Sequence, residues 1–176
     1  MMLKAGADAV KVEGGVSMAP TVKAMVEGGI PVVGHIGLTP QTATMLGGFK
    51  VQGKDLASAR RLLEDALAIE EAGAFMIILE CVPAPLARMI TSKLRIPTIG
   101  IGAGPHCDGQ VLVLADLLGL SPGPVPRFVR RYAQLDVAIR QAVAAFAGDV
   151  RSGSYPAPQE CYPDPPELAA WVEGEV

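Results

Sequence analysis

A lysine and a glutamate stand two residues apart near the start of the chain, as Lys11 and Glu13, at the end of an apolar stretch. Alternate side chains of a β-strand point to the same side, so this spacing presents a cation and an anion to one place. Gly14 and Gly15 follow and let the chain turn away. The pair is a candidate site, while a plain salt bridge or a solvated acid would also explain it.

Two further apolar stretches end in a polar residue: His35 follows 30–34, and Glu80 follows 75–79. A carboxylate in apolar surroundings is a candidate general base, because such surroundings disfavour its charged form. An imidazole at a strand end can bind a substrate or carry a proton. The alternatives are an acid and a histidine that are satisfied structurally. Polar groups at the ends of successive buried strands predict a site at the mouth of a barrel.

Short apolar runs alternate with helical patterns along the chain. We expect strands at 9–12, 30–34, 75–79, 97–101 and 111–114, and helices at 21–27, 55–72, 85–94 and 126–150. Strands that alternate with helices at this spacing predict right-handed βαβ units and a parallel sheet. Five strands fit an open doubly wound sheet, whereas a (β/α)8 barrel needs eight and typically about 250 residues.

Helix 55–72 has the clearest limits, with Asp55 as the expected N-cap and Gly73 at the C-terminal end. The apolar residues of the last expected helix recur at helical spacing, which predicts that they lie in the core. These residues are Phe128, Tyr132, Leu135, Ile139, Val143, Phe146 and Val150. The long glycine-rich segment 46–54 is typical of a lid or binding loop.

The sequence predicts a catalytic domain at 1–151 and a proline-rich arm at 152–176. We expect the arm to be irregular and either to pack on a neighbouring surface, with Trp171 as its anchor, or to be partly disordered. Glycines at 100, 102 and 104 suggest a phosphate loop, but the spacing lacks the GxGxxG fingerprint and the Walker lysine, so close packing is the better explanation. Cys81 beside Glu80 is interpreted as a packing residue, because no activating histidine is near it in sequence.

Composition excludes several classes of protein. Half of the 176 residues are hydrophobic, which allows a sizeable core, and the net charge of −3 gives no reason to expect a nucleic-acid partner. No apolar run approaches the ~18 residues of a membrane span, and the N-terminus lacks a signal-peptide layout, so a cytoplasmic location is expected. Three separated cysteines and two histidines argue against a structural zinc site.

Seven ordered motifs resemble one known family, ketopantoate hydroxymethyltransferase. They are residues 5–15 (AGADAVKVEGG), 34–41 (GHIGLTPQ), 47–53 (GGFKVQG), 79–83 (LECVP), 96–104 (IPTIGIGAG), 108–113 (DGQVLV) and 116–120 (DLLGL). The resemblance covers nearly all of residues 3–158. It implies a (β/α)8 barrel of which this chain holds strands four to eight. The three missing strands carry two metal-binding aspartates and a serine that helps to hold the keto acid in the family.

The resemblance also implies an activity and roles for residues. The family transfers a hydroxymethyl group from 5,10-methylenetetrahydrofolate to 3-methyl-2-oxobutanoate, which gives ketopantoate. Lys11 matches the lysine that binds the keto acid, Glu13 the glutamate associated with Mg²⁺, and Glu80 the proton acceptor; His35 is a secondary candidate for substrate binding. The family commonly assembles as a large homo-oligomer. Three hypotheses stay open: an active transferase, an inactive fragment of one, and an open α/β protein that binds a ligand.

Overall fold

The computed structural model describes residues 6–44, 47–163 and 165–175. Leu46, at the start of the predicted glycine-rich loop, and the first five residues of the predicted catalytic domain lie outside these ranges. The chain divides into two compact units, which are described separately. The first unit is Met1–Val113 with Val125–Arg130, and the second is Leu114–Pro124 with Arg131–Val176. The limits predicted for the catalytic domain and the arm stay a prediction.

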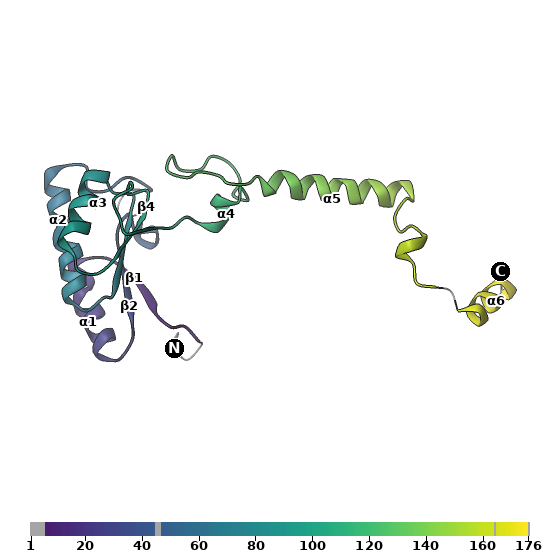
Figure 1. Cartoon of the computed structure of the whole chain (residues 1–176), viewed down its shortest axis with the longest axis horizontal. Helices are drawn as coiled ribbons and strands as arrows, with labels where there is room; N and C mark the ends of the chain where they lie inside the picture. The colour runs from purple at the N-terminus through teal and green to yellow at the C-terminus, as the bar shows by residue number, and fades with distance from the viewer. Residues whose placement is uncertain (1–5, 45–46, 164, 176) are drawn as a thin grey trace. The chain divides into compact units, whose positions relative to one another are not determined.

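A parallel sheet of five strands forms the centre of the first unit (Figure 1). Its strands are β1 (Val10–Glu13), β2 (Val32–Gly37), β3 (Met76–Glu80), β4 (Thr98–Ile101) and β5 (Gly109–Gln110). They lie side by side in the order in which they occur in the chain, and every neighbouring pair is parallel. The predicted parallel α/β sheet is therefore confirmed.

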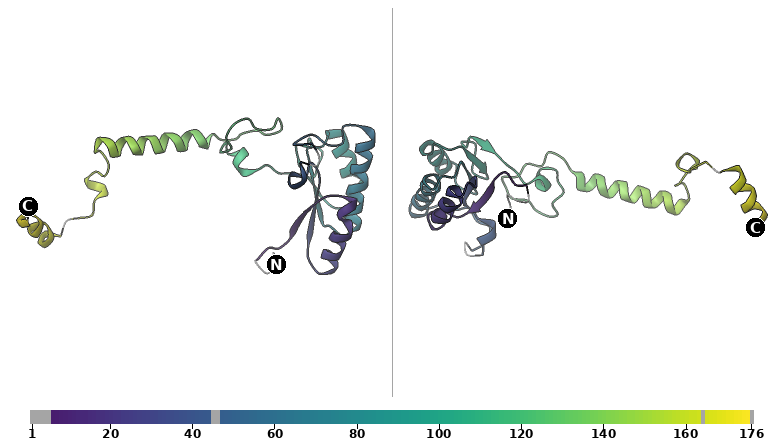
Figure 2. Two further views of the ribbon diagram at one scale, coloured as in Figure 1. Left: turned by 180° about the vertical axis from the view of Figure 1, so that it is seen from behind. Right: turned by 90° about the horizontal axis from the view of Figure 1, so that it is seen from below.

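Three helices cover one face of this sheet in all the views (Figures 1 and 2). They are α1 (Ala19–Glu27), α2 (Leu56–Glu71) and α3 (Ala84–Lys93). Right-handed crossovers between strands in consecutive order place every helix on the same face. A doubly wound sheet instead reverses its strand order and carries helices on both faces. The arrangement is therefore consistent with the TIM-barrel class.

The core lies between the sheet and these helices. Residues of β1, β2 and β3 that point to the helices alternate with residues that point to the other face, as the period of two requires. The largest fully buried apolar side chains come from both layers: Val22, Val32, Ile36, Ile69, Ile77, Leu79, Val82 and Ile90. Asp55 caps α2 as predicted, because its Oδ1 accepts the N–H of Ser58 at 2.9 Å. Hydrogen bonds from Ser58 lower the pKa of the Asp55 carboxyl.

Replacement of Ile69 by alanine is expected to destabilise the first unit by about 2–5 kcal/mol, because the side chain is fully buried and packs on the sheet at Gly34. The measurement is urea unfolding followed by circular dichroism. Leu67→Ala on the same helix is the matched control, since Leu67 is 41% exposed. Equal losses in the two variants would contradict the packing described here.

The fifth strand was predicted at 111–114, and this prediction is wrong. The strand is Gly109–Gln110, which pairs with Ile99 and Gly100, and Leu114–Leu117 forms the short helix α4. The Val111 N–H still donates to the Gly100 carbonyl, but no described strand pairs with the outer side of this edge. An apolar run extends as a strand only while a neighbour accepts its backbone hydrogen bonds, and here the pairing ends after two residues.

The long helix was predicted from 126, but α5 begins at Leu135 and ends at Ser152. The reason lies in the backbone: Tyr132 donates to Leu117, and Leu135 and Asp136 donate to Leu118 and Gly119. These N–H groups pair with the end of α4 and not with a preceding helical turn. The start of the helix is therefore set by contacts within the second unit.

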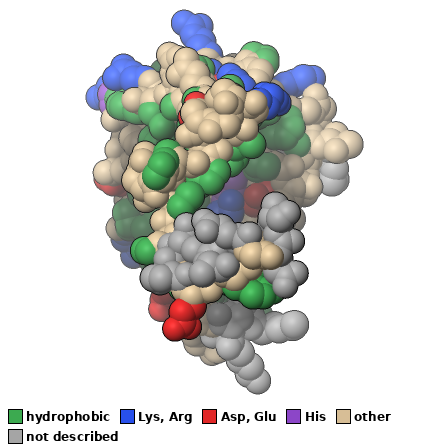
Figure 3. Space-filling view, turned by 90° about the vertical axis from the view of Figure 1, so that its right-hand side faces the viewer, with side chains coloured by type: hydrophobic (Ala, Val, Ile, Leu, Met, Phe, Trp, Pro, Cys, Tyr) green, Lys and Arg blue, Asp and Glu red, His purple; other side chains and the backbone are tan. Residues whose placement is uncertain are grey.

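The apolar stripe of α5 was predicted to be core, and this prediction is also wrong. None of its residues is buried, and Ile139, Val143 and Phe146 are each more than half exposed. Within the second unit, the described contact is an edge-to-face packing of the Phe146 and Tyr155 rings at 5.3 Å. The residues of this unit that the structure describes form no sheet on which the stripe can pack. Figure 3 shows that hydrophobic side chains occur at the surface of the face that it draws.

The C-terminal arm was predicted to be irregular, yet it contains a 3-10 helix at Pro158–Glu160 and helix α6 at Pro166–Glu175. Trp171, its expected anchor, is 63% exposed. Short 3-10 helices also occur in the first unit, at Val16–Met18 and Pro40–Thr42. Among the described residues, no helix is both long enough and apolar enough to cross a membrane.

Candidate active site

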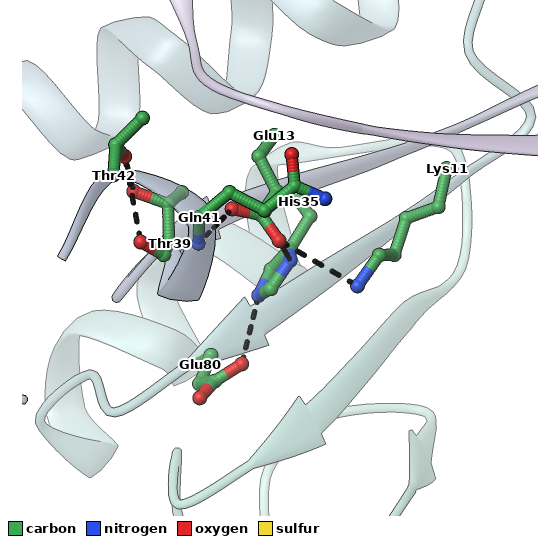
Figure 4. A network of polar contacts seen from close by, with 7 residues as sticks. All are labelled: Lys11, Glu13, His35, Thr39, Gln41, Thr42 and Glu80. Carbon is green, nitrogen blue, oxygen red and sulfur yellow. Dashed lines mark hydrogen bonds and ion pairs between the residues drawn. The ribbon is translucent and has the colours of Figure 1, made fainter.

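Lys11 and Glu13 lie on β1 and point away from the helices, as their spacing predicts (Figure 4). Lys11 Nζ is 3.8 Å from Glu13 Oε1. The lysine side chain is 44% exposed, whereas that of the glutamate is 6% exposed. The carboxylate is thus held inside the protein, while the ammonium group reaches open space and can meet a ligand.

His35 lies beside Glu13 because β1 and β2 pair in parallel with these two residues in register. Its Nδ1 is 3.5 Å from Glu13 Oε1, and its Nε2 is 3.0 Å from Glu80 Oε2. The ring is almost fully buried, and neither nitrogen meets the alignment of a hydrogen bond with any described partner. The imidazole therefore stands between two carboxylates, with both nitrogens available to them.

Glu80 ends β3 and reaches the same place because it pairs with Gly37, two residues after His35. Gly37 has a φ of +91° and lies so close to β3 that a Cβ would collide with the Glu80 carbonyl. A glycine is needed at this position for both reasons. The Glu80 side chain is 15% exposed, so it is shielded but still accessible.

The segment after β2 supplies a contact that the sequence did not indicate. The Gln41 N–H donates to Glu13 Oε2 at 3.0 Å, and Thr39 and Thr42 join their hydroxyl groups at 2.6 Å across the same turn. The turn holds the second oxygen of Glu13 in place. No pattern in the sequence could reveal this, since the donor is a backbone group.

Three of the four predicted side chains line a cavity of about 310 Å³, and the fourth, Glu13, contacts Lys11 and His35. Lys11, His35 and Glu80 line it, with apolar walls from Ile78, Ile101 and Val111. A larger cavity of about 500 Å³ lies beside α2 and contains none of the four. We assign the site to the smaller cavity, because a cation, an imidazole and a carboxylate converge there over an apolar floor. Such a set can bind an anion and accept a proton from it.

Comparison with known proteins identifies the family. A model of ketopantoate hydroxymethyltransferase matches residues 1–158. The chain belongs to this family. It is 62% identical over 162 residues to the 3-methyl-2-oxobutanoate hydroxymethyltransferase of Heliobacterium modesticaldum, which covers 92% of this chain and 59% of the relative. The enzymes of the same name from Chloroflexus aurantiacus and Syntrophomonas wolfei are 56% and 53% identical, and the matches cover 97% and 90% of this chain.

The chain spans about three fifths of the length of these hydroxymethyltransferases. The resemblance stated from the seven sequence motifs is confirmed at the level of the family. All four site residues lie within the matched range and come together in the structure. Their individual roles in the hydroxymethyltransferase reaction stay predictions.

The metal that the family resemblance implies can be tested against the residues present. Within the described ranges, no group of three or more His, Cys, Asp and Glu side chains is placed to hold a metal ion. Glu13 offers carboxylate oxygens, which Mg²⁺ prefers, but a single carboxylate is not a complete site. Within the described ranges the chain therefore provides fewer than three such ligands at one place, and Glu13 would need further ligands to complete a site.

Cys81 follows Glu80 and is the one described non-glycine residue with a positive φ, at 50°. Its N–H donates to Ile101 and its carbonyl accepts from Gln52, so the strained backbone is held on both sides. Burial raises the pKa of the Cys81 thiol, and the Glu80 carboxylate raises it further. A thiol that resists ionisation is a poor nucleophile, which agrees with a packing role.

The glycines after β4 also have a structural explanation. Gly104 has a φ of +77°, and a Cβ there would collide with Ala84 at the start of α3. The close approach of this loop to the helix requires a residue without a side chain. Close packing, the explanation preferred from the sequence, therefore accounts for Gly104 without a bound phosphate.

Proposed function

We propose that this chain forms the C-terminal part of a (β/α)8 ketopantoate hydroxymethyltransferase, in which its five strands are strands four to eight. The observation that carries the proposal is the convergence of Lys11, His35 and Glu80 at one cavity, with Glu13 in contact with Lys11 and His35, in a chain that belongs to this family. The substrate would be 3-methyl-2-oxobutanoate, and the one-carbon donor 5,10-methylenetetrahydrofolate. The open face of the sheet supports an incomplete barrel: half-buried Val33, Met76, Ile78 and Ile99 surround a cavity of about 300 Å³ there.

The chemistry needs a carbanion next to a ketone. In this proposal Glu80 removes the proton from C3 of the keto acid, and the electron pair of that C–H bond becomes the enolate. Lys11 binds the carboxylate and stabilises the charge that develops on the ketone oxygen. Water adds to the methylene group of the donor, and both of its bonds to the folate nitrogens break, which gives tetrahydrofolate and formaldehyde. The enolate carbon then forms a C–C bond with the formaldehyde carbon, and the proton held by Glu80 passes to the new hydroxyl oxygen. Water supplies the hydroxyl group of ketopantoate.

Other parts of the proposal rest on the family resemblance. Glu13 would contribute one ligand to Mg²⁺, with two aspartates of the missing strands, and the ion would polarise the two oxygens of the keto acid when bound. We place the reaction in the cytoplasm and the complete protein in a homo-oligomer. The exposed apolar side chains of α5 support an assembly, since contiguous apolar surface commonly marks an interface.

The test is an assay of two proteins with Mg²⁺, 3-methyl-2-oxobutanoate and 5,10-methylenetetrahydrofolate. One is the 176-residue chain, and the other is the completed barrel, defined as this chain preceded by the upstream part of the Heliobacterium modesticaldum relative. We expect ketopantoate from the completed barrel alone, because the short chain lacks strands that close the site. The intact relative is the positive control.

Either of two results would contradict the proposed function. A folded completed barrel that forms no ketopantoate would overturn the proposed activity of this chain. Ketopantoate from the 176-residue chain would show that the missing strands are not required, and the assignment of an incomplete barrel would be wrong.

A further inference from the structure

His35 is more deeply buried than any other member of the site, and each of its ring nitrogens lies close to a carboxylate oxygen. Its side chain is 2% exposed, against 6% for Glu13 and 15% for Glu80. A buried polar ring normally has hydrogen-bond partners. Both nitrogens instead face carboxylate oxygens, Nδ1 towards Glu13 and Nε2 towards Glu80, without the full alignment of a hydrogen bond (Figure 4).

We propose that His35 is a positioning residue that holds the Glu80 carboxylate through Nε2 and so orients this carboxylate towards the substrate. The inference rests on the proposed function of the site. The Nε2–Oε2 distance of 3.0 Å is within hydrogen-bonding range, and a small rotation of either group would align the contact. One Glu80 oxygen is then occupied by the ring, and the other is left to accept the proton of the keto acid.

The position of the ring is rigid, which a positioning residue requires. His35 sits in the middle of β2, bonded between β1 and β3, and its side chain has almost no exposed surface. Glu80 is the last residue of β3, and its side chain is more exposed, at 15% against 2% for His35. Because the imidazole ring is the more enclosed of the two groups, we infer that the ring orients the carboxylate and that the carboxylate does not orient the ring.

The two nitrogens can be tested separately with amide side chains. The amide nitrogen of glutamine reaches approximately the place of Nε2, and that of asparagine the place of Nδ1. We therefore compare His35→Gln with His35→Asn in the completed barrel. His106→Gln is the matched control, because His106 is the other histidine of the chain and is exposed outside the site.

The first readout is the exchange of the C3 proton of 3-methyl-2-oxobutanoate in D2O without folate, which isolates proton removal. We expect exchange to fall at least tenfold in His35→Asn and to stay within about threefold of the parent in His35→Gln. The second readout is the division of the effect between kcat and KM. A positioning role predicts a fall in kcat with little change in the KM of the keto acid.

The outcomes separate this inference from the proposed function. Equal losses in the two variants, with both folded by circular dichroism, would overturn it, as would an increase in KM alone, which would make His35 a substrate-binding residue. Full exchange in His35→Asn would overturn it as well. If the parent completed barrel shows neither exchange nor ketopantoate, the proposed function itself fails, and this inference fails with it.

Discussion

Replacement of Glu80 by glutamine in the completed barrel is expected to lower kcat by about 10²–10⁴-fold, the usual contribution of a general base. Glutamine has almost the same shape but cannot accept the proton of the keto acid. Its amide can keep a contact with His35, which lies 3.0 Å from the present carboxylate, so the fold of the site should survive. The measurements are steady-state formation of ketopantoate and exchange of the C3 proton.

Glu71→Gln is the control for this prediction, because Glu71 is exposed on α2 and lies outside the cavity. We expect the KM of the keto acid to change little in Glu80→Gln, since the proton acceptor acts on a C–H bond and not on the carboxylate. An unchanged exchange rate in this variant would remove Glu80 from the role of base. The same amide substitution at Glu71 should leave both readouts at the level of the parent.

Replacement of Lys11 by methionine should lower kcat/KM by about 10²–10³-fold, the loss typical when one donor to a developing oxyanion is removed. Methionine keeps much of the length of the side chain and removes only the charge. The exposed Lys11 side chain points into the cavity, where it can meet both the carboxylate and the ketone oxygen of the substrate. We therefore expect KM to rise and kcat to fall together.

Lys23→Met is the matched variant, because Lys23 on α1 is exposed and pairs only loosely with Glu27 at 4.0 Å. Its kinetic constants should be those of the parent. If Lys11→Met keeps its kcat/KM, Lys11 only neutralises Glu13, which is the plain salt bridge that the sequence also allowed. An isothermal titration with the keto acid would then show no loss of affinity in this variant.

Much of the site could be predicted because of the regular geometry of strands. The spacing of Lys11 and Glu13 places them on one face of β1, and the ends of parallel strands meet at one edge of a sheet. The register of the strands then decided how close the groups lie. Glu13 pairs with His35 and Glu80 with Gly37, which places the imidazole between the two acids. No single strand carries that information.

Where prediction failed, the structure of the segment depends on neighbours distant in sequence. The apolar run at 111–114 has strand composition, but the sheet edge offers a partner for only two residues, and a helix follows. The stripe on α5 has the periodicity of a core helix, yet periodicity only states that one face is apolar and does not supply a surface to cover it. Both predictions failed because the partners of these segments are distant from them in sequence.

The sequence by itself determined the parallel α/β class, the cap of α2, the family and the four polar residues at the strand ends, because these depend on local spacing and residue type. The tertiary structure decided which groups touch: the backbone contact of Gln41 with Glu13, and His35 between Glu13 and Glu80. Such contacts depend on strand register and on the path of a turn, which arise only when the backbone hydrogen bonds of the whole sheet form together.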